Sequence, residues 1–111
     1  MVDAVNAFLR GLDRPLILWL ISEGPKHGYG LIKEVKRLTG QKLKPGTLYP
    51  LLYWLEDEGF VVGEWIKKGR RDLRCYRLTE KGKALLAQVH GLFHKPIRRV
   101  IADLLSERRE N

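Results

Sequence analysis

The hydrophobic pattern of this 111-residue chain changes from helical to strand-like at residue 60 and becomes helical again near residue 80. Residues 60–67 and 73–78 are rich in β-branched and aromatic side chains, which favour extended strands. The connecting residues, 68–72, contain Gly69 and are few enough to close a β-hairpin. A short hairpin therefore interrupts a chain that is otherwise helical. We expect Trp65, on its first strand, to pack against a neighbouring helix.

Two helices are expected before residue 25. Apolar residues recur at spacings of three and four over residues 2–12, which is the pattern of an amphipathic helix. Residues 16–21 are apolar on every side, so the second helix should be the buried centre of the domain, with Trp19 in the core. Gly24 and Pro25 then end it.

A third helix is expected over residues 28–39. We expect His27 to cap its start, Tyr29 to pack in the core and Gly40 to end it in a left-handed conformation. These local signals define a compact helix with recognisable ends.

A fourth helix runs from about residue 47 to Glu58, and Gly59 ends it. Thr47 is the expected N-cap, because Pro50 then falls in the first turn, where its missing N–H is not needed. A start one or two residues earlier remains open.

The last segment carries the longest helical stripe. Thr79 should cap it, and apolar residues recur across Pro96, so that one kinked helix and two shorter helices both fit. This stripe and that of residues 2–12 exceed what so small a core can cover, which predicts a homodimer. The expected interface residues are Val2, Val5, Leu9, Leu86, Val89, Phe93, Ile97, Val100 and Leu104.

The charge of the chain points to an acidic partner, nucleic acid first, because the formal net charge is +8. Basic residues concentrate in residues 30–44 and 60–83, whereas the charged residues of 45–59 are acidic and lie at 56–58. The acidic group sits about 12–15 Å along the helix from Thr47, so the other end should face DNA. The candidate DNA-binding residues are Lys42, Lys44, Thr47, Tyr49, Lys67, Lys68, Arg70, Arg71 and Arg74.

Several other classes of protein are not supported. The longest apolar run is far shorter than the roughly 18 residues of a membrane span, and no basic leader precedes it. Cys75 is the single cysteine, so no internal disulfide is expected and a cytoplasmic location is the simplest. His90 and His94 have the spacing of a metal pair, but no thiol or carboxylate nearby completes a site. We expect no metal, no cofactor and no enzymatic activity.

The order of elements predicts a fold that is mainly α with a small β-hairpin. Compact helices followed by a two-stranded wing form the winged helix-turn-helix arrangement, here with N-terminal and long C-terminal dimerisation helices. We place a winged-helix DNA-binding domain at residues 1–80 and a C-terminal dimerisation helix at residues 81–111.

A set of motifs in chain order over residues 15–84 resembles one known family. The motifs are His27-Gly28-Tyr29-Gly30, Gly46-Thr47-Leu48-Tyr49-Pro50-Leu51-Leu52, Leu55-Glu56-Asp57-Glu58-Gly59-Phe60-Val61, Arg70-Arg71 and Tyr76-Arg77-Leu78-Thr79-Glu80-Lys81-Gly82. On these motifs the chain resembles the PadR family of transcriptional regulators. The resemblance implies a winged-helix DNA-binding domain, a dimerising C-terminal part and repression, often relieved by a small and frequently aromatic effector.

The main hypothesis is therefore a PadR-like repressor that binds a palindromic operator in double-stranded DNA as a homodimer. A sequence-tolerant architectural DNA-binding protein is the first alternative, and a protein-interaction winged helix is the second. The cationic wing argues against the second. Trp54 stands where PadR proteins usually have a basic or polar residue, so we expect it near the dimer seam, where a planar aromatic effector would bind.

Overall fold

The computed structural model describes residues 11–106, except for the side chains of Pro96 and Ile97. Nearly all of the helix expected over residues 2–12, including Val2, Val5 and Leu9, lies outside the described residues. The elements are α2 (Asp13–Ser22), β1 (Lys26–His27), α3 (Gly28–Thr39), α4 (Pro45–Asp57), β2 (Val61–Lys68), β3 (Arg71–Leu78), α5 (Glu80–Leu92), η1 (Phe93–Ile97) and α6 (Arg98–Leu105).

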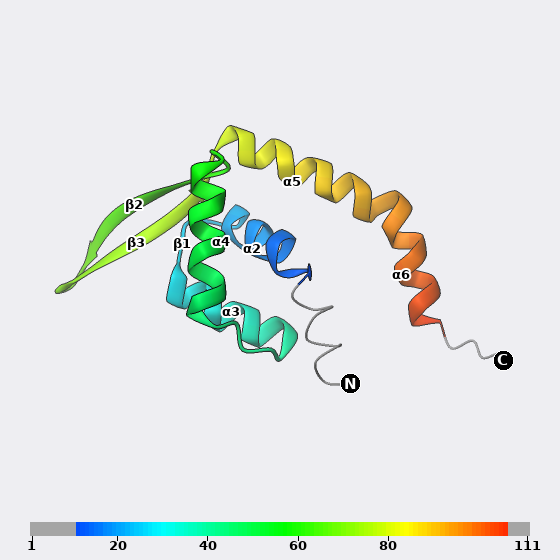
Figure 1. Cartoon of the computed structure of the whole chain (residues 1–111), viewed down its shortest axis with the longest axis horizontal. Helices are drawn as coiled ribbons and strands as arrows, with labels where there is room; N and C mark the ends of the chain where they lie inside the picture. Colours follow the sequence, from blue (N-terminus) through cyan, green and yellow to red (C-terminus); the bar gives the residue numbers. More distant parts are fainter. Residues whose placement is uncertain (1–10, 107–111) are drawn as a thin grey trace.

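A helical body carries two projections (Figure 1). Helices α2, α3 and α4 pack together, the β2–β3 hairpin extends from one side, and the α5–α6 segment extends from the other. The three strands form an antiparallel sheet in the order β1-β3-β2. This confirms the mainly α winged fold expected from the sequence.

The core is built around α2, as expected, but Trp19 is not part of it. Ile17, Leu20 and Ile21 are buried, whereas Trp19 is 44% exposed. The expectation was wrong because an apolar helix without periodicity gives no signal for the face that stays open.

Helix α3 has the expected ends. His27 caps it, since its Nδ1 accepts a hydrogen bond from the Gly30 N–H at 3.1 Å, and Gly40 is left-handed with φ +74°. Tyr29, expected in the core, is instead 65% exposed. Gly28 faces α4 at this point, where any side chain would overlap the hydroxyl of Tyr49.

Helix α4 begins at Pro45 with Lys44 as its N-cap, three residues before the expected cap at Thr47. Pro45 takes the first-turn position that was assigned to Pro50, so Thr47 lies inside the helix and does not cap it. Pro50 is an interior residue and lacks the N–H that would bond to the carbonyl of Gly46.

The hairpin has a tighter turn than expected. Strands β2 and β3 pair from Val61↔Leu78 to Lys68↔Arg71, which leaves a turn of Gly69 and Arg70. Gly69 has φ +64°, a conformation that glycine adopts without strain. The additional strand β1 was not foreseen, because two residues are too few to show a strand pattern.

Trp65 was expected against a helix and is 68% exposed. The expectation failed because the hairpin reaches beyond the helical body, so its outer part has no helix beneath it (Figure 1). The wing is therefore a projecting arm with one large aromatic side chain on its surface.

The C-terminal segment is one kinked helical rod. Thr79 caps α5 as expected, accepting the Gly82 N–H at 3.0 Å. The π-helical segment η1 contains Pro96 and joins α5 to α6, and the rod bends there (Figure 1). Among the described residues, no helix is long and apolar enough to span a membrane.

Candidate nucleic-acid interface

The first turns of α3 and α4 meet through Tyr49. Its half-buried ring packs over Gly28 at the start of α3, and its centroid lies 6.3 Å from that of Tyr53. Thr47, two residues before Tyr49 on the same helix, is exposed. Lys42 and Lys44, which precede the helix, are also exposed. The structure therefore gathers four of the candidate DNA-binding residues around the start of α4.

The tip of the wing presents the second group of candidates. Lys67, Lys68, Arg70 and Arg71 are all exposed. None of these four takes part in an ion pair within the part of the chain that the structure describes. Solvated cations without an acidic partner are the groups that bind DNA phosphates and release counterions.

Arg74 differs from the other wing cations. Its Nη2 donates to Oε2 of Glu56 at 2.7 Å, and the Gly63 N–H donates to the same oxygen at 3.3 Å. Its guanidinium lies 5.5 Å from the ring centre of Trp65 and 5.8 Å from that of Tyr76. Arg74 is thus held at the base of the wing, and we leave it out of the proposed phosphate contacts.

The Glu56–Arg74 pair connects the end of α4 to both strands of the wing. A side chain on Gly63 would lie 2.8 Å from the Arg74 guanidinium, so the pair needs a glycine there. Burial raises the pKa of the Tyr76 hydroxyl, which leaves a neutral ring beneath the cation. We call Glu56, Gly63 and Arg74 the wing clamp, because together they hold the wing against α4.

Two exposed tyrosines near α4 were missed as candidates. Tyr29 projects from the first turn of α3 with the Lys33 Nζ 5.6 Å from its ring centre, and Tyr53 is 56% exposed on α4. Helical periodicity contained the signal for Tyr29, which falls opposite the buried Leu31 and Val35.

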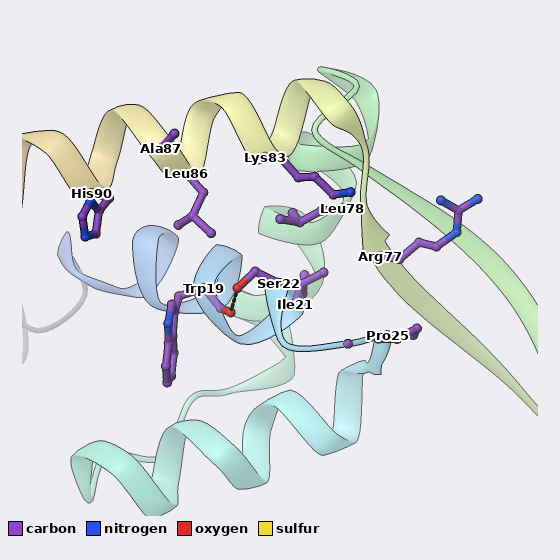
Figure 2. A pocket seen from close by; sticks show the side chains of 11 residues that line it. Trp19, Ile21, Ser22, Pro25, Arg77, Leu78, Lys83, Leu86, Ala87 and His90 are labelled. Atoms are coloured by element: carbon purple, nitrogen blue, oxygen red, sulfur yellow. Dashed lines mark hydrogen bonds between the residues drawn. The ribbon is translucent and has the colours of Figure 1, made fainter.

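Trp54, the aromatic residue singled out for effector binding, is 40% exposed, and two side chains of its own chain contact its ring. The Arg14 guanidinium lies 4.9 Å from the ring centre of Trp54, and the ring of Phe60 lies 6.0 Å away. Trp19 instead lines an open, mostly apolar groove of about 700 Å³ between α2, α5 and the end of β3 (Figure 2). Arg77, Lys83 and His90 stand around this groove.

The histidine pair is present as the spacing predicts. The rings of His90 and His94 stack with their centres 5.6 Å apart. Within the described residues, no group of three or more His, Cys, Asp or Glu side chains could hold a metal ion.

Comparison with known proteins identifies the family. Residues 17–88, which include the end of α2, the whole of α3 and α4, the wing and most of α5, match the transcriptional regulator PadR-like family. The chain belongs to this family. PadR-family regulators bind DNA, so the exposed cations of the wing and the start of α4 lie on a fold used for that purpose.

Relatives of this PadR-like chain share its sequence and its fold. A transcriptional regulator of Mycobacterium tuberculosis is 35% identical over 97 residues, covering 87% of this chain and 90% of the relative. The crystal structure of a PadR-family regulator from Eggerthella lenta is 30% identical, with a TM-score of 0.77 over 96% of this chain and 94% of the other. A transcriptional activator of Haloferax mediterranei is 34% identical over 70 residues, which are 62% of this chain and 34% of the activator.

Proposed function

We propose that this PadR-like regulator binds specific DNA sites as a homodimer and represses transcription in the cytoplasm. The first turns of α4 enter the major groove, while the wing tip contacts neighbouring phosphates. The exposed wing cations without acidic partners carry this proposal. Lys42 and Lys44 add phosphate contacts ahead of α4.

The dimer is proposed from the apolar surface of the C-terminal rod. Val100 is 55% exposed and Leu104 is 76% exposed, although both belong to the helical stripe. Leu86, Val89 and Phe93 continue that stripe at the body and are half-buried. Residues 1–80 then form the DNA-binding domain and residues 81–111 the dimerisation helix. Two-fold symmetry favours a palindromic operator with half-sites about 34 Å apart.

Repression is the regulatory direction that the PadR resemblance favours. A dimer seated on an operator that overlaps a promoter excludes the polymerase from the same DNA. The Haloferax relative is named an activator, so the direction needs its own test. Transcription from a promoter that carries the bound site should fall when the regulator is added. An increase would assign activation instead.

Capture of genomic fragments by the purified protein tests sequence-specific binding. A few strongly enriched loci that share a palindromic motif support the proposal. Uniform recovery of the genome would favour the alternative, a sequence-tolerant architectural DNA-binding protein, which the net charge of +8 also allows.

We place an aromatic effector in the groove beside Trp19, not at Trp54. The groove has apolar walls and basic side chains around it, which suits a planar aromatic acid. Titration with such acids should quench tryptophan fluorescence and shift DNA affinity by the same coupling factor. Quenching that persists in Trp19→Phe would exclude this groove.

A further inference from the structure

The exposed surface of the first turns of α4 is free of charged and amide side chains. From Pro45 to Leu55 the sequence contains no Asp, Glu, Lys, Arg, His, Asn or Gln. The residues exposed there are Pro45, Gly46, Thr47, Pro50, Tyr53 and Trp54. They present a methyl group, proline methylenes, two aromatic rings, one indole N–H and two hydroxyls.

This composition limits how the helix can discriminate bases. In the major groove, Arg and Lys pair with guanine, Asn and Gln with adenine, and acidic side chains with cytosine. Methyl and other apolar groups contact the 5-methyl group of thymine. Residues 45–55 of α4 therefore have no side chain for the first three kinds of contact, and they offer the fourth.

Three other side chains of α4 already have contacts within the protein. Glu56 is held by Arg74, and the Arg14 guanidinium lies against one face of Trp54, which stays 40% exposed. Tyr49 directs its hydroxyl towards Gly28. Thr47, Pro50 and Tyr53 are exposed on the same part of the helix and have no such charged neighbour in the described part of the chain.

Pro50 adds a separate argument. An interior proline removes a helical hydrogen bond and is unfavourable in most helices. Its ring is exposed, so burial in the core does not compensate for that loss. A residue that is unfavourable for its local structure and also exposed is often kept for function. Here the ring of Pro50 gives α4 a rigid apolar surface for contact.

We propose that Thr47, Pro50 and Tyr53 discriminate bases mainly by contacting thymine 5-methyl groups in the major groove. This inference rests on the proposed function, because it requires α4 to lie in that groove. The ligand is a duplex whose half-sites place thymines opposite these three side chains. Arg and Lys of the wing supply affinity for phosphates, which is independent of those methyl groups.

Deoxyuridine tests the inference, because it differs from thymidine by the methyl group alone. The best duplex from a random-sequence selection is remade with single dT-to-dU replacements, and its affinity is measured at fixed salt. We expect about a fourfold loss for each contacted methyl group, no loss for replacements outside the site and no change for a scrambled duplex.

A conservative variant connects the loss to a residue. Thr47→Ser removes the methyl group and keeps the hydroxyl, so the penalty for dU should disappear at one thymine. Thr39→Ser, the same change at the end of α3, should leave every dU penalty unchanged. If Thr47→Ser weakens dT and dU duplexes equally, the methyl group of Thr47 does not contact a thymine methyl group and the inference is wrong.

The failure of this inference differs from failure of the proposed function. Specific binding that tolerates all dU replacements would overturn the thymine contact and leave specific DNA binding intact. Absence of any preference for the selected duplex over the scrambled duplex would overturn both.

Discussion

At the scale of single residues, Arg74 shows how a charge that looks suited to DNA acquires a different role. Its sequence neighbours at the wing tip are exposed, whereas Arg74 donates to Glu56 across an 18-residue separation. The wing clamp orients the wing relative to α4, so Arg74 and Glu56 are positioning residues. If Glu56 acts only through its charge, its removal should raise DNA affinity. If Glu56 positions the wing, its removal should lower DNA affinity.

Glu56→Ala provides that comparison. Loss of a negative charge near DNA should tighten binding if charge alone matters, and it also frees Arg74 for phosphates. We expect binding to weaken about fivefold instead, because loss of a partly exposed ion pair worth about 1 kcal/mol releases the wing. Fluorescence anisotropy with a labelled duplex measures the change.

Asp57→Ala is the control, because it removes the same charge without touching Arg74 and should not weaken binding. Equal effects of the two variants would refute the clamp.

At the scale of elements, the sequence predicted those features that depend on local signals. The cap at His27, the left-handed Gly40 and the cap at Thr79 each need a few neighbouring residues, and all three are confirmed. The hairpin was also predicted, because its strand pattern and glycine turn are local. The predicted start of α4 was wrong, because Pro45 and Pro50 both suit a first turn and the sequence does not show which of them occupies it.

Features that depend on tertiary packing were not predictable in the same way. Trp19 and Trp65 are exposed because of where α2 and the wing lie relative to the rest of the body, which hydrophobicity does not encode. Glu56 and Arg74 were assigned to separate charge groups, since nothing in their spacing shows that they meet. The order of elements and the family motifs were sufficient for the fold, but not for the wing clamp.

The wing itself should contribute affinity without specificity. Replacing Arg70 and Arg71 by Ala removes two exposed cations, so binding should weaken for all duplexes and the salt slope should fall by about two. Arg98→Ala with Arg99→Ala is a matched control on α6, where the same charge is lost far along the other projection. A wing variant with unchanged affinity and salt slope would exclude the wing from the interface.

At the scale of the whole molecule, we assign different roles to the two projections: DNA contact to the wing and dimerisation to the C-terminal rod. The wing extends towards one side and the C-terminal rod towards the other, so the proposed DNA contacts and the proposed dimer interface lie on separate surfaces (Figure 1). The rod carries exposed leucine and valine side chains on α6, which water disfavours unless another surface covers them. A second copy of the chain is the proposed partner.

Charged substitutions on the rod should prevent dimerisation without removing the DNA-binding surface. Val100→Glu combined with Leu104→Glu should convert the dimer to a monomer, because each carboxylate would be buried in an apolar interface. Light scattering at micromolar concentration measures the mass, and Gln88→Glu on α5 controls for added charge. The monomer should lose most of its affinity for a palindromic site and retain weak binding to a half-site. A monomeric mass for the unaltered protein would contradict the dimer.

The central claim is that this PadR-like chain recognises particular DNA sequences. The most direct measurement is the ratio of its affinities for the selected palindromic duplex and for a scrambled duplex of equal length and composition, at one fixed salt concentration. We predict a ratio of about 1,000 or more, with two chains bound per site. A ratio near one at every salt concentration would contradict the account.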